Sequence, residues 1–238
     1  MISAPLRNRN KKITHHRGVP LSSPFGRAIV LPFAALSLAC CALLTGCGLG
    51  ANNSGAATPI AVAGSHLRGS VHGGQQPVSG SVIQLYAASS TGYGSGFPYG
   101  SGTSLLGSNI VMTDASGGFN ITNDYICPAA STLVYLVATG GNPGIGSTNN
   151  PNIAVMAALG PCGNLSASTF IAVNELTTVA SVWALSPFMT GIGNIGTSST
   201  NAIGLTNAFA TVNKLVNVGT GATEGTTLPA GVFFRLLR

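Results

Sequence analysis

Few side chains in this sequence could catalyse a reaction or bind a metal ion. The 238 residues include four histidines and four acidic residues, and no G-x-S-x-G turn, H-E-x-x-H helix, P-loop or Rossmann glycine pattern. The best pair for a hydrolytic site is His72 with Asp114, because a carboxylate can orient an imidazole as a general base. Nothing in their spacing brings the two together. We therefore keep a small envelope hydrolase at His72 and Asp114 as an alternative, and expect no enzyme, no cofactor and no metal site.

The elements that would position these residues begin only after a long N-terminal segment. Residues 1–27 are basic and contain no acidic residue, and residues 28–44 form an uncharged apolar run. A basic region followed by an apolar one is the pattern of an export signal. The run is also marginally long enough for an uncleaved single-pass anchor, which is the alternative.

The residues that end the apolar run favour the signal. Leu44-Thr45-Gly46-Cys47 is similar to the bacterial lipobox, a branched apolar residue and two small residues before a cysteine. The resemblance implies that the Cys47 thiol receives diacylglycerol and that cleavage falls between Gly46 and Cys47, which removes a signal peptide of residues 1–46. Cys40 and Cys41, inside the apolar run, are rival sites with a poorer match. The expected partner of Cys47 is membrane lipid, because two or three acyl chains hold a protein stably.

Charge and flanking residues then indicate the destination. The formal net charge of +6 belongs to the signal, since six of the ten basic residues precede Cys47 and the remaining four are balanced by four acidic ones. With no basic surface left we expect no nucleic-acid partner. Gly48 follows Cys47, so no aspartate resembles an inner-membrane retention signal, and no twin-arginine pair is present. The sequence predicts Sec export to the outer membrane or the cell surface.

Two further cysteines remain once Cys47 is assigned to lipid. Cys127 and Cys162 form an even pair in an oxidising compartment, where disulfides persist. A bridge between them closes a loop that the chain-entropy model values at roughly 3.8 kcal/mol. Two free buried cysteines are the alternative. A metal site is not expected, because no histidine or third cysteine follows at ligand spacing.

Residues 66–140 are expected to form an antiparallel β-sandwich, reached through a flexible small-residue tether over 47–65. Short β-rich runs are separated by turn clusters. In one of them Val82, Gln84 and Tyr86 alternate with Ile83 and Leu85, which predicts a strand with one buried face. The predicted strands are residues 67–72, 80–87, 109–113, 118–122 and 132–139.

Four weak motifs occur in an informative order: G-S-V at 69–71, Q-P-V-S-G-S-V-I-Q-L at 76–85, T-D-A-S-G-G-F-N-I at 113–121 and Y-L-V-A at 135–138. Together they resemble the carboxypeptidase regulatory-like (prealbumin-like or Cna-B-like) sandwich over residues 67–140. The resemblance implies a transthyretin-like or Ig-like fold that serves as an accessory, adhesive or spacer module. A Gly/Ser/Tyr insertion from Ser89 to Ser104 departs from that pattern. Its Tyr93, Phe97 and Tyr99 suit a binding loop, and a low-complexity loop without fixed structure is the alternative.

The fold class predicted for the whole exported part is α+β. A Gly/Asn/Pro-rich connection over 141–165 contains an apolar run that could add a strand, and a helical segment follows over 166–218. Asn174 should cap a first helix that ends near Leu185, because Pro187 stops it. Helical spacing over 205–216 predicts a second helix. Trp183 and Phe209 are the expected anchors of this helix pair on the sandwich.

The function predicted from these features is a membrane-anchored, non-catalytic binding or spacer module of the cell envelope. Its expected partners are an envelope protein or a carbohydrate. Residues 219–238 end in a basic, apolar run that suggests a truncated tail, so an N-terminal fragment of a larger repeat-containing surface protein is a further alternative. A structural component of an envelope assembly is another.

Overall fold

A computed structural model of the chain describes residues 58–98, 100–122 and 125–224. All of them belong to one unit of the chain, residues 55–238. The predicted signal peptide, Cys47, Tyr99 and residues 225–238 lie outside the described residues. A search of the described part finds no helix with the length and apolar character needed to span a membrane.

The first sheet is built around β2 (Leu67–Gly73), which has β6 (Gly118–Ile121) on one side and β10 (Phe170–Val173) on the other. The short β3 (Gln76–Pro77) folds back on the end of β2. The β2–β6 pair is antiparallel, whereas β2 and β10 run parallel in register from Arg68–Phe170 onward. This pair departs from the predicted antiparallel arrangement because β10 enters the sheet from the opposite layer rather than through a hairpin.

The second sheet has the order β5 (Val111–Met112), β4 (Val82–Ala87), β8 (Leu133–Thr139), β9 (Ala154–Pro161), with every neighbour antiparallel. The apolar run in the predicted connection therefore does form a strand. Five consecutive residues of β8, from Val134 to Ala138, are buried. A strand buried on alternate residues has one covered face, so β8 must be covered on both.

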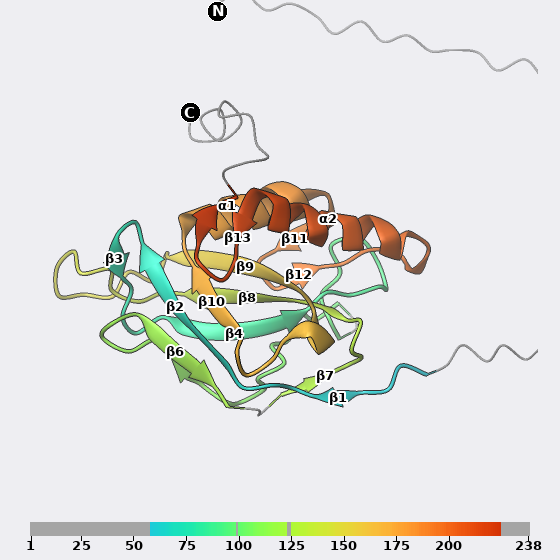
Figure 1. The fold of residues 1–238 in the computed structure, drawn as a ribbon, viewed down its shortest axis with the longest axis horizontal. Helices are drawn as coiled ribbons and strands as arrows, with labels where there is room; N and C mark the ends of the chain where they lie inside the picture. Colours follow the sequence, from blue (N-terminus) through green and yellow to red (C-terminus); the bar gives the residue numbers. More distant parts are fainter. Residues whose placement is uncertain (1–57, 99, 123–124, 225–238) are drawn as a thin grey trace, which may run out of the picture. The chain divides into compact units, whose positions relative to one another are not determined.

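Two separate cores account for this burial; Figure 1 shows the two sheets and the helices that bound them. The first lies between the two sheets, and the second lies between the β4-β8-β9 surface and the helices. Tyr86, which is 6% exposed, belongs to the second core, so the prediction of a single buried face for β4 is wrong. The first core includes Leu67, Val71, Ile83, Leu85, Phe119, Ile121, Leu136 and Ile171; the second includes Tyr135, Val137, Met156, Ala180, Leu205, Phe209 and Val212.

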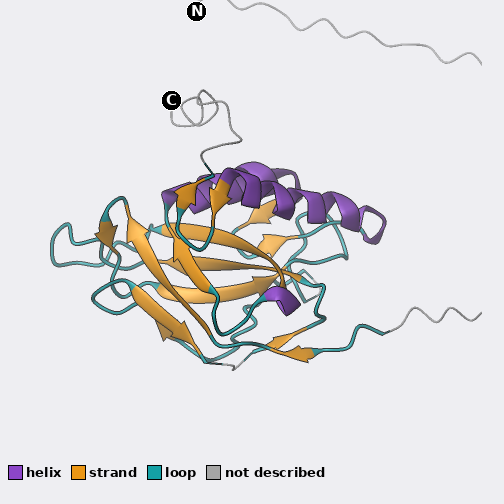
Figure 2. Ribbon diagram, viewed as in Figure 1, coloured by secondary structure: helices purple, strands orange, loops and turns teal. Residues whose placement is uncertain are grey.

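The helix pair covers the outer side of the second sheet, as Figure 2 shows and as predicted. In α1 (Glu175–Leu185), Asn174 accepts a hydrogen bond from the Thr177 backbone N–H, and the Thr177 hydroxyl accepts one from the Asn174 N–H. This capping box fixes the predicted start of the helix. In α2 (Ala202–Leu215), Phe209 is only 2% exposed and anchors the packing. The described part of the chain therefore has an α+β fold of mostly antiparallel sheets with two helices toward its C-terminal end.

Trp183 does not anchor the helix pair, because it is 49% exposed. The face of α1 that packs on the sheet carries small residues instead, and these let its backbone approach β9. The hydroxyls of Thr178 and Ser181 accept hydrogen bonds from the Met156 and Ala158 backbone N–H groups at 2.9 and 3.0 Å. β9 is the last strand of its sheet, so these N–H groups have no neighbouring strand to pair with. The hydroxyls of α1 accept their hydrogen bonds instead.

Two tyrosines stack inside the second core, with ring centroids 5.5 Å apart. The Tyr86 hydroxyl donates to the Gln84 side-chain oxygen at 2.8 Å. The Tyr135 hydroxyl is buried and has no hydrogen bond of normal geometry within the described residues. Burial, followed by the neighbouring Tyr86, raises the pKa of Tyr135 above its usual range, and the Ile195 backbone amide opposes this only in part. This neutral hydroxyl is therefore an unsatisfied polar group in an apolar layer.

The chain enters the fold earlier than a free tether over 47–65 would imply. β1 (Val62–Ala63) pairs antiparallel with β7 (Ile126–Cys127), and the Ser65 hydroxyl donates to the Leu165 carbonyl at 3.0 Å. Residues 62–65 are thus part of the folded unit. The remaining short elements are β11 (Met189–Gly191), β12 (Asn194–Ile195), β13 (Val216–Asn217), β14 (Ala222–Thr223) and 3-10 turns at Cys162–Asn164, Ser186–Phe188 and Ser199–Asn201.

Candidate functional site

The predicted disulfide is confirmed: Cys127 and Cys162 are bonded, with their Cα atoms 6.1 Å apart. Cys127 belongs to β7, beside the entering strand β1, and Cys162 opens the 3-10 turn that follows β9. Both side chains are buried in the first core. The bridge is therefore a structural link and no reactive thiol is available there.

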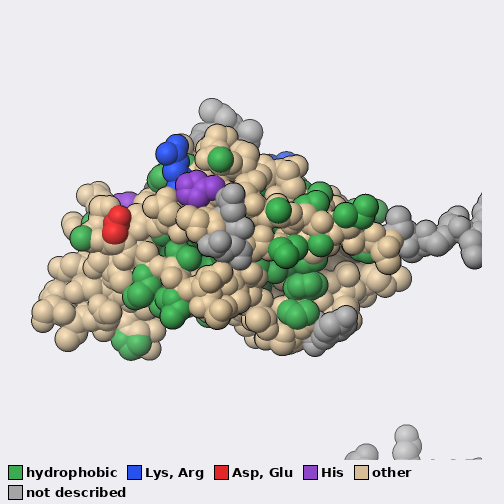
Figure 3. Space-filling model, turned by 90° about the horizontal axis from the view of Figure 1, so that it is seen from below, with side chains coloured by type: hydrophobic (Ala, Val, Ile, Leu, Met, Phe, Trp, Pro, Cys, Tyr) green, Lys and Arg blue, Asp and Glu red, His purple; other side chains and the backbone are tan. Residues whose placement is uncertain are grey.

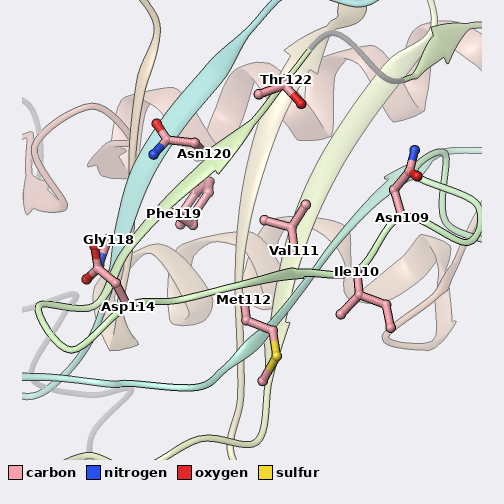
Figure 4. A pocket seen from close by; sticks show the side chains of 9 residues that line it. All are labelled: Asn109, Ile110, Val111, Met112, Asp114, Gly118, Phe119, Asn120 and Thr122. Atoms are coloured by element: carbon pink, nitrogen blue, oxygen red, sulfur yellow. The ribbon is translucent and has the colours of Figure 1, made fainter.

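Asp114 stabilises its own turn and is not free to orient another side chain. One of its carboxylate oxygens accepts hydrogen bonds from the Ser116 N–H, the Ser116 hydroxyl and the Gly118 N–H at 2.6–2.9 Å. The Ser116 hydroxyl, and then these amides, lower the pKa of Asp114. Asp114 lines a hollow of about 490 Å³ between β5 and β6, shown in Figure 4, in which it is the sole titratable side chain.

His72 lies in a different hollow, of about 460 Å³, whose lining also includes Glu175. The Glu175 carboxylate accepts a hydrogen bond from the Gly74 N–H at 2.5 Å. The structure thus groups His72 with Glu175 and not with Asp114. Within the described residues no cluster of three histidine, cysteine or acidic side chains could hold a metal ion. On the face shown in Figure 3, charged side chains are sparse among uncharged ones.

The Gly/Ser/Tyr insertion, where described, has a defined structure that rests on β11 and β12. Backbone hydrogen bonds join the Ser89 N–H to the Ile195 carbonyl, the Thr197 N–H to the Ser89 carbonyl and the Gly94 N–H to the Gly196 carbonyl, all within 3.1 Å. The alternative of a loop without fixed structure is therefore wrong for these residues. Backbone pairing of this kind gives the loop a defined path, because its N–H and C=O groups are satisfied by the neighbouring backbone.

The glycine that directly follows β12 makes this approach possible. A Cβ atom at Gly196 would collide with the carbonyl oxygens of Ser95 and Gly92. The loop backbone therefore occupies the space that a side chain would take. The small residues that suggested a low-complexity loop are thus needed in part because the loop backbone and the backbone after β12 pass close to each other.

Tyr93 joins the insertion to the segments on either side of β11 and β12 through its side chain. Its ring stacks on Phe188, with centroids 5.8 Å apart and planes 12° apart, and its hydroxyl accepts a hydrogen bond from the Asn201 side-chain amide at 2.5 Å. These contacts hold the ring against the fold, and the Tyr93 side chain is still 55% exposed. Phe97 instead lines a surface hollow, and the following residue, Tyr99, is outside the description.

That hollow and an adjoining one form a groove at one end of the sheets, which we call the hydroxyl groove. Their volumes are about 390 and 220 Å³, and they share the walls made by residues 88–90 and 131–132. The larger falls in the range of roughly 300–1,000 Å³ that is typical of ligand clefts. The lining of the hydroxyl groove is Pro59, Ala88, Ser89, Ser90, Thr91, Phe97, Pro98, Pro128, Ala129, Ser131, Thr132, Leu133, Thr197, Ala202, Leu205 and Thr206.

The hydroxyl groove contains no charged side chain and no histidine. Its polar groups are serine and threonine hydroxyls. Within the described part of the chain, those of Ser90, Ser131 and Thr132 make no hydrogen bond to the protein. Because a hydroxyl both donates and accepts, these three can pair with either kind of ligand atom. Phe97 and Pro98 provide an apolar wall beside them.

Sequence reasoning identified one wall of this groove, through Phe97, but missed the other two. Residues 128–132 follow the disulfide cysteine, and residues 197–206 lead into α2. Neither stretch has a composition that marks a binding surface, so no local signal would have found them. Comparison with known protein families, with characterised proteins and with solved structures finds no match to this chain.

Proposed function

We propose that the chain is a lipid-anchored, extracytoplasmic module of a bacterial envelope that binds a partner through the hydroxyl groove and has no catalytic activity of its own. The observation that carries the proposal is the groove itself. It is uncharged, its backbone walls are held by internal hydrogen bonds, and three of its hydroxyls have no partner among the described residues. A rigid site of this kind suits recognition, because little conformational entropy is lost on binding.

The disulfide supports the proposed location. Structural disulfides persist in oxidising compartments outside the cytoplasm, and the Cys127–Cys162 bridge links two buried segments of the fold. The lipobox-like Leu44–Cys47 segment supports an anchor at Cys47 and release of residues 1–46. The fold also fits a transthyretin-like sandwich of the carboxypeptidase regulatory-like kind, in which two facing sheets enclose one core. Modules with that architecture would act as binding or spacer units.

A hydrolase is the weaker proposal, since no described geometry favours it. Asp114 is engaged by its own turn, and His72 lines another hollow.

Mass spectrometry of the protein extracted from membranes tests the anchor. We expect a mature N-terminus at Cys47 with a mass increment for acyl chains. Cys47→Ser should abolish both the increment and processing, whereas the matched variant Cys40→Ser should retain them. An intact Met1 on the membrane-bound protein would refute the anchor, because processing at Cys47 removes it.

A further inference from the structure

We infer that the hydroxyl groove binds an uncharged carbohydrate, and that the groove lies close to the membrane anchor. This inference rests on the proposed function and names the ligand class of the same site. Three properties of the groove carry it: the kind of polar group it offers, the pairing of its backbone, and its position next to the point where the chain enters the fold.

The chemistry of the lining fits a sugar better than an ion or a hydrocarbon. A charged ligand would lose water without meeting an opposite charge, because the lining has none. A wholly apolar ligand would leave the Ser90, Ser131 and Thr132 hydroxyls buried and unpaired. A sugar ring has hydroxyls that donate and accept at its edge and C–H groups on its faces. The edge matches these three hydroxyls, and a face matches the half-buried Phe97 ring.

The backbone pairing argues against an extended peptide as the ligand. Peptides that bind as strands need free N–H and C=O groups on the receptor. Here the Ala88 N–H donates to the Leu133 carbonyl and the Cys162 N–H to the Thr132 carbonyl. Both backbone groups of Ser89 are also paired, with the Ile195 carbonyl and the Thr197 N–H. These backbone groups are therefore taken, and the groove offers a ligand mainly its side-chain hydroxyls.

The distance of the groove from the membrane anchor is limited by its most N-terminal lining residue. Pro59 belongs to the lining, and β1 follows three residues later. The chain between Cys47 and Pro59 spans at most about 40 Å when fully extended. With Cys47 in the membrane, the groove can reach only glycans within that distance of the lipid surface. Two sources have this chemistry: a neutral glycolipid headgroup and a neutral polysaccharide strand running beside the membrane.

The test uses the full-length protein in detergent micelles on an array of neutral and acidic glycans, followed by titration of the best ligand. We expect neutral glycans to bind and acidic ones to bind no better. Phe97→Ala should weaken binding at least tenfold. Ser131→Phe should abolish binding, because it fills the groove from an exposed position. Trp183→Ala is the control: it removes an exposed aromatic ring outside the groove and should leave affinity unchanged.

Each result decides a separate point. Failure of every neutral glycan to bind, or preference for acidic ones, overturns the inference. Binding that survives both Phe97→Ala and Ser131→Phe, in variants with unchanged circular dichroism, refutes the assignment to this groove. If Ser131→Phe instead abolishes binding of an isolated envelope protein, the proposed function survives and the carbohydrate does not. Vesicles that display the bound glycan as a lipid headgroup, compared with the free glycan, distinguish the two sources.

Discussion

Removal of the disulfide should reduce the stability of this protein by an amount that can be calculated from its position. Cys127 and Cys162 are separated by 35 positions. The loop between them contains β8 and β9, the two strands that form the centre and edge of the second sheet. In the chain-entropy model, closure of a loop of this length stabilises the native state by roughly 3.8 kcal/mol, since the unfolded chain loses freedom when it is cross-linked.

Urea unfolding followed by far-UV circular dichroism measures this quantity. The Cys127→Ala/Cys162→Ala variant should lose about 4 kcal/mol of unfolding free energy, which corresponds to a fall of roughly 8–15 °C in Tm for a domain of this size. The dependence of that free energy on urea should become steeper, because the unfolded chain without the bridge exposes more surface. The reduced wild-type protein is the control, since it keeps both sulfur atoms in the core but lacks the bond.

Two outcomes would contradict this reasoning. Equal midpoints for the oxidised and reduced wild type would show that the bridge adds no stability. A large loss in the double variant without a comparable loss in the reduced wild type would place the effect in the packing of the sulfur atoms rather than in the unfolded chain.

Other perturbations separate the contributions of single side chains. Phe209→Ala should cost about 3–5 kcal/mol in urea unfolding because it empties the second core, whereas Trp183→Ala should cost less than about 1 kcal/mol. Tyr135→Phe should stabilise the fold by about 1–3 kcal/mol, since it removes an unsatisfied buried hydroxyl. The pKa of Asp114 is lowered in the folded state, chiefly by the Ser116 hydroxyl. Its ionised carboxylate should therefore stabilise the fold above the unfolded-state pKa, and this stabilisation should be lost as the pH falls through the lower folded-state pKa. Asp114→Asn should remove this part of the pH dependence of unfolding.

Matched measurements make these expectations falsifiable. Tyr86→Phe removes a hydroxyl that is hydrogen-bonded to Gln84, so it should lose stability where Tyr135→Phe gains it. The same sign for both variants would exclude the unsatisfied hydroxyl as the cause. Ser116→Ala should reproduce part of the Asp114→Asn effect on acid unfolding. An unaltered acid transition in both variants would mean that this turn contributes nothing to it.

Local signals in the sequence were sufficient for elements whose ends are determined locally. The first helix begins and ends as predicted, because Asn174 caps it and Pro187 follows its last turn. The positions of the first and fourth predicted strands match β2 and β6 to within one residue at either end, since short β-rich runs between turns identify strands. The disulfide followed from a count of cysteines.

Features that depend on distant contacts were missed. β10 is a short strand whose partner β2 lies about a hundred positions earlier, so no local hydrophobic pattern predicts the parallel pair. Trp183 was chosen for its size, but α1 approaches β9 through hydroxyls and small side chains, a mode of packing that hydrophobicity does not reveal. The hydroxyl groove combines Pro59 with three longer segments, of which only the one containing Phe97 has a suggestive composition. Assembly in three dimensions, rather than any one stretch, creates the site.

The pairing of β1 with β7 determines how a mechanical load would pass through this protein. A pull on the chain before Pro59 reaches the fold at Val62, whose partner in the pair is Cys127 itself. Once the two-residue β1 separates, the force acts on Ser65 and β2. The neighbouring β7 stays linked to the end of β9 by the Cys127–Cys162 disulfide. Tension would therefore strip the entry strand first and leave the walls of the groove at residues 128–132 in place.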